Sequence, residues 1–193
     1  MGKRILVLLG HPKTRSFSGA LADAYVRGTR NAGADVKYVK LSELDIDYLT
    51  LKGFGHIEKD LKKMRELIIW AEEIVVVYPT WWGNMPALLK GFFDRVLAPG
   101  FAFSYYSNGF GWRKFLKGRS ARIITVTGGP WVLNHWIYGS PGIKSLKWAM
   151  FWFSGIWPVR VSEFSGIDMK FTSAKTRERW IKQAEKIGER DGK

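Results

Sequence analysis

The chain has 193 residues, the size of one domain with a buried core, and we treat residues 1–193 as a single domain. It contains no cysteine, which excludes disulfides and thiolate metal sites and agrees with a reducing cytoplasm, where we expect the protein. The net charge of +14 suits anionic ligands, but the basic residues are spread out and form no nucleic-acid motif, so we expect no nucleic-acid site.

Apolar runs alternate with amphipathic segments along the chain. In chain order they predict a strand at 4–9, a helix at 18–32, a strand at 35–41, a helix at 57–72, a strand at 74–78, a helix at 85–97 with Pro86 in its first turn, a short hairpin within 101–118, a strand at 121–126, a helix at 143–153, a strand at 159–164 and a helix at 172–189. Five strands separated by helices predict an α/β fold, a parallel sheet with helices on both faces. The acidic pair Glu72 and Glu73 lies away from the carboxyl ends of the strands, and we expect it on solvated faces.

No apolar run reaches the roughly 18 residues that a membrane span needs. The N-terminal apolar run is also too short for a signal peptide and lacks a cleavage site, so it predicts the first strand.

Three loops follow predicted strands and should meet at one edge of the sheet, where ligands bind in open α/β folds. The first presents the hydroxyls of Thr14, Ser16 and Ser18 at the start of a helix, which is a typical phosphate site. Capping of the helix by Ser16 or Ser18 is the alternative explanation. Neither a GxGxxG nor a GxxxxGK[ST] motif is present, which disfavours a Rossmann dinucleotide site and excludes a P-loop.

The second loop contains adjacent indoles, Trp81 and Trp82, between Pro79-Thr80 and Gly83-Asn84. Indoles offer flat faces for stacking, and we expect one at a ligand and the other packed under the loop. The third loop, Thr127-Gly128-Gly129, allows close approach of the backbone to a ligand.

Downstream of the third loop lie His135 and Tyr138. For His135, a proton-donating role and a hydrogen-bonded structural role are equally favoured. The three loops are poor in carboxylates, and no metal-binding motif is found, so we expect no metal.

The segments HPKTRSFSGAL (11–21), YPTWWGNMPALLKGFFDRV (78–96), PGFAF (99–103) and TGG (127–129) resemble the flavodoxin-like NAD(P)H:quinone oxidoreductases, a family that includes modulators of drug activity and ancillary quinone reductases of potassium-efflux systems. The resemblance runs from Ile5 to about Gly129. It implies a doubly wound three-layer sandwich with a five-stranded parallel sheet in the order 2-1-3-4-5.

The resemblance also implies site residues. His11, Ser16, Phe17 and Ser18, with Thr14 beside them, would hold the flavin phosphate and ribityl chain. Pro79, Thr80, Trp81, Trp82, Gly83 and Asn84 would line the isoalloxazine ring, and Thr127, Gly128 and Gly129 would approach its pyrimidine end. The best-studied branch has Tyr and then His after the Gly pair, and His135 and Tyr138 are the corresponding catalytic candidates here.

The implied function is transfer of hydride from NAD(P)H through a bound flavin, most simply FMN with FAD as the alternative, to a quinone-like acceptor. The resemblance implies a homodimer, and the tryptophan-rich stretch 131–157 suits its interface better than a membrane surface. The alternatives are a flavin-binding electron carrier and a regulatory subunit of a membrane channel.

Overall fold

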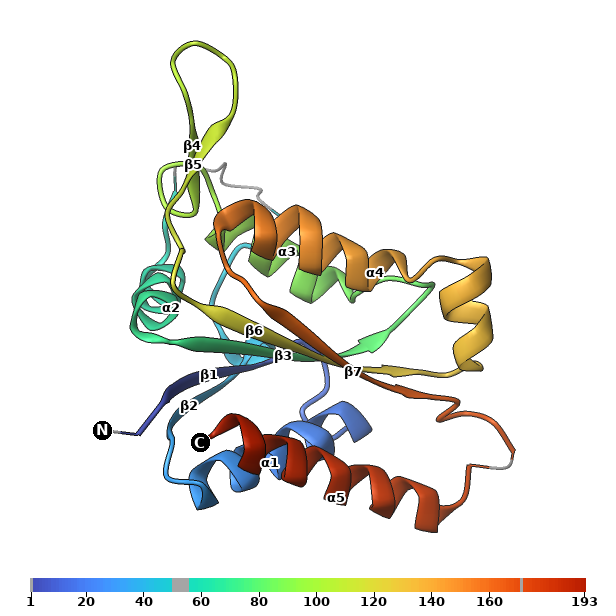
Figure 1. Cartoon of the computed structure of the whole chain (residues 1–193). Helices are drawn as coiled ribbons and strands as arrows, with labels where there is room; N and C mark the ends of the chain where they lie inside the picture. The colour runs from blue at the N-terminus through green and yellow to red at the C-terminus, as the bar shows by residue number, and fades with distance from the viewer. Residues whose placement is uncertain (1, 50–55, 171) are drawn as a thin grey trace.

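A twisted parallel sheet of five strands forms the middle layer of the computed structural model, which describes residues 2–49, 56–170 and 172–193 (Figure 1). The strands are β1 (Arg4–Leu9), β2 (Asp35–Lys40), β3 (Glu73–Thr80), β6 (Ser120–Thr127) and β7 (Val159–Ser165). They lie in the order β2-β1-β3-β6-β7 and all pair in parallel. β4 and β5 form a separate two-stranded sheet, so β6 and β7 are the fourth and fifth strands of this one. The order is therefore the predicted 2-1-3-4-5, and the doubly wound fold is confirmed.

Helices cover both faces of the sheet (Figure 1). One face carries α1 (Phe17–Asn31) and α5 (Ala174–Asp191). The other carries α2 (Lys59–Trp70), α3 (Ala87–Val96), α4 (Pro141–Lys144) and the π-helical η3 (Ser145–Trp152), which continues α4. Short helical turns follow two strands: η1 (Leu41–Glu43) follows β2, and η2 (Leu133–Ile137) follows β6.

The central strands are apolar on both faces because each face is covered by helices. Successive side chains of a strand point to opposite faces, and β1 divides accordingly. Ile5, Val7 and Leu9 pack in the core under α1 and α5. Leu6 and Leu8 pack in the core under α2 and α3. Burial on both sides therefore makes β1 the continuous apolar run that the sequence displays.

Helices α1 and α5 pack with their backbones close together. A Cβ on Gly28 would lie 2.0 Å from the carbonyl oxygen of Glu185, and a Cβ on Gly188 would lie 2.2 Å from that of Tyr25. Only glycine fits such a crossing. This packing fixes α1, whose N-terminus lies at the carboxyl edge of the sheet.

Four details differ from the sequence predictions. Pro86 directly precedes α3 instead of lying in its first turn. The η2 turn was not predicted, and the helix expected at 143–153 begins earlier, at Pro141. Glu73 is fully buried, since Lys3 at 2.5 Å and Arg160 pair with its carboxylate, so the expectation of a solvated face was wrong for this residue.

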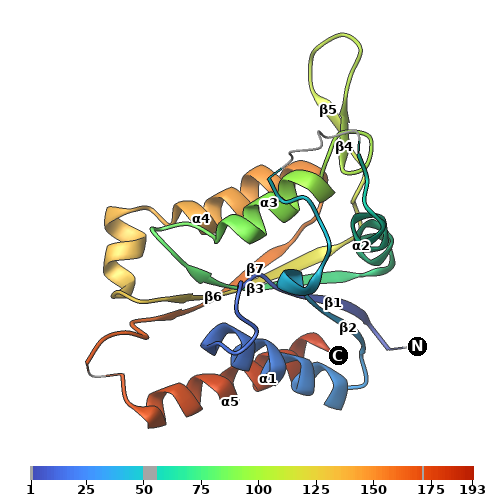
Figure 2. The same cartoon turned by 180° about the vertical axis from the view of Figure 1, so that it is seen from behind.

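The predicted hairpin is present. It consists of β4 (Phe103–Tyr105) and β5 (Trp112–Lys114), paired antiparallel, and it projects from the body of the molecule (Figure 2). Both chain termini lie at the amino end of the sheet, away from its carboxyl edge (Figure 1).

Candidate active site

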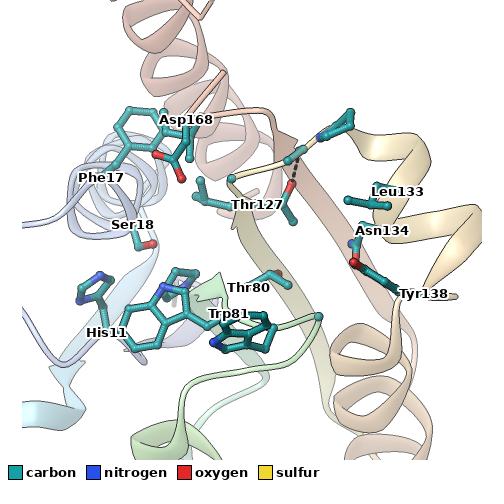
Figure 3. Close-up of a pocket in the computed structure, with 18 residues that line it drawn as sticks. His11, Phe17, Ser18, Thr80, Trp81, Thr127, Leu133, Asn134, Tyr138 and Asp168 are labelled. Carbon is teal, nitrogen blue, oxygen red and sulfur yellow. Dashed lines mark hydrogen bonds between the residues drawn. The ribbon is translucent and has the colours of Figure 1, made fainter. Parts of the chain in front are cut away.

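A cavity of about 490 Å³ opens at the carboxyl edge of the sheet, where loops leave β1, β3, β6 and β7. Twelve of the residues predicted for the site line it: His11, Phe17, Ser18, Pro79, Thr80, Trp81, Trp82, Gly83, Thr127, Gly128, Gly129 and Tyr138. Four others, Thr14, Ser16, Asn84 and His135, are not in its lining. The three predicted loops thus meet around one cavity (Figure 3).

The first wall is the N-terminus of α1. Ser16 is its N-cap, and its hydroxyl accepts a hydrogen bond from the Gly19 N–H at 3.1 Å, which is the capping role considered as an alternative. Ser18, in the first turn, is buried and faces the cavity. Since the first N–H groups of a helix have no partners within the helix, this wall offers donors and a positive dipole end to an anion.

His11 stands beside this helix. Its Nδ1 accepts a hydrogen bond from the Lys13 backbone N–H at 2.9 Å, and its ring meets the Trp81 indole edge to face at 5.4 Å. Burial lowers the pKa of His11 from its ordinary value, and the Lys13 charge acts in the same direction although the hydrogen bond opposes them. The imidazole is therefore neutral at physiological pH and hydrogen-bonds through Nδ1 as an acceptor.

The second wall is a tight turn over Trp81–Asn84. The two ends are joined by reciprocal backbone hydrogen bonds of 2.8 and 2.9 Å. Both central residues have positive φ, 52° at Trp82 and 74° at Gly83. Such a conformation strains a bulky residue like tryptophan, and strain of this kind concentrates at functional sites. The Trp82 side chain is fully exposed and that of Trp81 is 45% exposed. Neither indole therefore packs under the loop, although we expected one of them to do so.

The third wall is the loop after β6, where the Thr127 hydroxyl donates to the Gly129 carbonyl at 3.3 Å. A Cβ on Gly128 would lie 2.5 Å from Oδ2 of Asp168, so glycine is needed here for the loop after β7 to approach. Asp168 itself lines the cavity. The three predicted loops contribute no carboxylate to the lining, and Asp168 comes from a fourth loop, which was not among them.

The fourth wall is η2, which carries Asn134 and Tyr138 into the lining opposite His11 and Ser18 (Figure 3). The Asn134 side chain donates at 2.8 Å to Oε1 of Glu163, whose side chain is only 6% exposed. Its own Oδ1 is buried with no hydrogen-bond partner among the described residues. It is an acceptor that a ligand N–H group would satisfy.

His135 is not part of the cavity lining. Its Nδ1 is 2.6 Å from the Ser140 hydroxyl, and its Nε2 is 3.6 Å from Oε2 of Glu163. Its ring also contacts Trp131 at 4.4 Å. These contacts match the structural role considered for His135, and its catalytic role stays a prediction.

Six lining residues were not among the predicted site residues: Val126, Pro130, Leu133, Asn134, Ile167 and Asp168. Two of them, Ile167 and Asp168, come from the loop after the fifth strand. A parallel fifth strand must end at the same edge as its neighbours, so its loop could have been included from the sequence alone.

The residues present fit a flavin. A helix N-terminus suits a phosphate, the indole of Trp81 offers a flat face, and Asn134 provides an unpartnered acceptor suited to a ring N–H group. Among residues 2–49, 56–170 and 172–193, no group of three or more acidic or histidine side chains is placed to hold a metal ion. Within the same ranges, no helix has both the length and the apolar character required to cross a membrane.

A family model described as a flavodoxin-like fold matches residues 3–187, and the chain belongs to this family. An NAD(P)H oxidoreductase of Haemophilus influenzae is 34% identical over 105 residues, which are 51% of this chain and 52% of that protein. The mouse ribosyldihydronicotinamide dehydrogenase [quinone] is 26% identical over 154 residues, which are 66% of this chain and 64% of that protein. These names confirm the resemblance to NAD(P)H:quinone oxidoreductases, although the matches span only half to two thirds of the relatives' length.

The fold is shared with solved structures over the whole chain. An FMN-dependent NADH-azoreductase from Bacillus anthracis, solved in complex with FMN, superposes with a TM-score of 0.79 at 20% identity. The superposition covers 99% of this chain and 100% of that one, which shows the common fold.

Proposed function

We propose that this protein is a flavin-dependent NAD(P)H oxidoreductase that passes two electrons to quinones or similar acceptors. The observation that carries the proposal is the single cavity in which a helix N-terminus, exposed indoles and glycine-rich backbone meet at the carboxyl edge of the sheet. The names of the relatives, NAD(P)H oxidoreductase and quinone dehydrogenase, support the same activity. FMN is favoured over FAD because α1 offers one site for a terminal phosphate.

Each wall has a role in this proposal. The N-terminus of α1, with Ser18, holds the phosphate, and the Trp81 indole supports one face of the ring system. A flavin bound there would supply the redox chemistry, the capacity to take up a hydride and to give up two electrons. The backbone of Thr127–Gly129 stabilises negative charge at the ring edge, and Tyr138 meets the acceptor at the rim.

Several parts of the proposal rest on the sequence resemblance. These are the phosphate contacts of Thr14 and Ser16, the ring contact of Asn84, the catalytic role of His135, the homodimer and the cytoplasmic location. Thr14 and Ser16 lie on the same loop as Ser18, and a small movement of that loop on binding would bring their hydroxyls to the phosphate.

Steady-state kinetics tests the proposed activity. Protein loaded with FMN should oxidise NADH or NADPH with a simple quinone, whereas an electron carrier or a regulatory subunit should not. Because the Trp81–Asn84 turn covers one side of the cavity, donor and acceptor must use the open side in turn. Double-reciprocal plots at several quinone concentrations should therefore be parallel, and absence of turnover with both nucleotides would overturn the proposal.

A further inference from the structure

The cavity differs in charge from the rest of the chain. The protein carries 31 lysines and arginines against 17 acidic residues. None of these cations is among the 18 described residues that line the cavity, whereas one carboxylate, that of Asp168, is (Figure 3). His11, which also lines the cavity, is neutral near physiological pH because burial lowers its pKa. The charged side chain that this lining offers to a ligand is therefore an anion.

The Asp168 carboxylate has no partner within the described part of the chain. Residues 2–49, 56–170 and 172–193 form neither an ion pair with it nor a hydrogen bond to its oxygens. Arg177, near the start of α5, donates instead to the neighbouring carbonyl of Ile167 at 3.1 Å. A carboxylate that is left unpaired in a chain with a net charge of +14, and that lines a cavity, is suited to contact a ligand.

The turn that carries Asp168 is fastened to the third wall of the cavity. The backbone N–H groups of Gly166 and Ile167 both donate to the Thr127 carbonyl, at 2.9 and 3.0 Å. A Cβ on Gly128 would collide with Oδ2 of Asp168, so glycine at this position lets the carboxylate rest on the backbone of the wall. The carboxylate is thus held in place before any ligand binds.

Asp168 lies where the first and third walls of the cavity meet. Figure 3 places it beside Phe17, the first residue of α1, and away from Asn134 and Tyr138. Phe17 and Ile167, the neighbour of Asp168 in sequence, pack against the same core under α1 and α5. A ligand that joins a phosphate at α1 to a ring at the third wall would therefore pass this carboxylate with the part that links the two.

An unpaired carboxylate restricts the chemistry of that linking part. Its oxygens accept hydrogen bonds and do not donate them, so hydroxyl or N–H groups satisfy them and a phosphate is repelled. In dinucleotide-binding α/β proteins, an acidic side chain receives the hydroxyl of a ribose in the same way. A metal ion is a poor alternative, because no group of three acidic or histidine side chains among the described residues is placed to hold one.

We propose that Asp168 accepts hydrogen bonds from hydroxyl groups of a sugar chain that links the phosphate and the ring of the ligand, and that it thereby selects ligands with such a chain. The inference rests on the proposed function and deepens it, because a flavin nucleotide carries a sugar chain between its phosphate and its ring. A hydrogen bond to a charged acceptor is stronger than one between neutral groups, so loss of one such contact should lower the affinity roughly tenfold.

Binding of lumiflavin, riboflavin and FMN tests the proposal. Lumiflavin has a methyl group in place of the sugar chain, riboflavin has the chain, and FMN has the chain and the phosphate. Quenching of flavin fluorescence gives the dissociation constants for the flavin-free, full-length protein. Asp168→Ala should weaken riboflavin binding roughly tenfold and leave lumiflavin binding unchanged. FMN binding should be weakened less than riboflavin binding, because the variant also removes the repulsion between the carboxylate and the phosphate.

Two further variants serve as controls. Asp168→Asn keeps an oxygen that accepts a hydrogen bond but removes the charge, so it should weaken riboflavin binding less than Asp168→Ala does. Glu178→Ala removes the same charge from an exposed residue of α5 outside the cavity lining, and it should leave all three dissociation constants unchanged. Thermal unfolding establishes that each variant is folded.

The outcomes separate this inference from the proposed function. Equal weakening of lumiflavin and riboflavin by Asp168→Ala would assign the residue a structural role, and stronger FMN binding with unchanged riboflavin binding would assign it only repulsion of the phosphate. Either result would overturn the inference. So would three unchanged constants in Asp168→Ala when the wild type binds flavins, a result that leaves the proposed function standing. A wild type that binds none of the three would overturn both.

Discussion

The Asn134 amide donates to the buried carboxylate of Glu163 at 2.8 Å, which fastens the η2 turn at the rim of the cavity to the end of strand β7. Ser165 donates to the same oxygen at 3.1 Å. The rim is therefore held by the fifth strand, the element whose loop also supplies Asp168. Glu163 is not part of the cavity lining, so its carboxylate positions the residues of η2 from outside the cavity.

We predict that Glu163→Ala lowers the free energy of unfolding by about 1–3 kcal/mol, because it leaves the buried Asn134 amide without its acceptor. It should also raise the KM for the quinone, since Tyr138 is carried by the same turn. Glu163→Gln keeps an acceptor oxygen, so its loss of stability and its rise in KM should both be smaller. Denaturant unfolding and initial rates measure the two effects, and wild-type stability in Glu163→Ala would contradict the assignment.

We expect the backbone conformation of Trp82 to lower the free energy of unfolding, while its indole contributes to ligand binding. Its φ of 52° costs a bulky side chain about 1–2 kcal/mol, whereas Asn followed by Gly suits this turn. We predict that Trp82→Asn raises the unfolding free energy by about 1 kcal/mol and reduces turnover. The control is Phe110→Asn, at an exposed position without positive φ, which should not raise the unfolding free energy. A destabilised Trp82→Asn would show that the indole makes contacts that outweigh the strain.

Much of the fold could be predicted because burial leaves a periodic pattern. The run at β1 is apolar throughout since both its faces are covered, and α1 shows helical spacing since one face packs on the sheet. The three strand-end loops could be assembled into one site because parallel strands end at a common edge.

The features that could not be predicted from the sequence depend on contacts between residues that are distant in the chain. Burial of Glu73 requires Lys3 and Arg160, which are remote in sequence, and nothing local distinguishes it from the exposed Glu72. The η2 turn has apolar and aromatic residues without helical or strand period, so no element was predicted there.

Glu58 provides a pH-dependent contribution to stability. Its carboxylate lies 2.7 Å from the nearly fully buried Arg95. Burial would raise the pKa of Glu58, but hydrogen bonds from the backbone N–H groups of Glu58 and Asp47 and from Arg95 outweigh it and hold the pKa below its ordinary value. A lowered pKa in the folded state stabilises the protein above the unfolded-state pKa, and this stabilisation is lost as pH falls through the folded-state pKa.

We therefore predict that Glu58→Gln costs about 3 kcal/mol near neutral pH, and that the difference from wild type shrinks below about pH 5 as the wild-type carboxylate protonates. Glu43→Gln, in an exposed pair with Lys40, should change stability by less than about 1 kcal/mol. Urea unfolding across this pH range is the measurement. A difference for Glu58→Gln that stays constant with pH would contradict the role of its charge.

The homodimer expected from the sequence is best sought at the rim of the cavity. Trp136 and Ile137, in η2, and Tyr138, which follows it, are all exposed. We predict that Ile137→Asp dissociates the dimer in sedimentation velocity experiments, because a carboxylate would be buried without a partner. Phe110→Ser should leave the dimer intact. A wild-type monomer at all concentrations would contradict this prediction.

The most direct test of the central claim is anaerobic reduction of the flavin-loaded protein. The protein is incubated with excess FMN, desalted, and mixed without oxygen with NADH or NADPH and then with a quinone. We predict that flavin absorbance survives desalting, is bleached by a nicotinamide nucleotide and returns on addition of the quinone. Failure to retain either FMN or FAD, or a retained flavin that neither nucleotide reduces, would contradict the account.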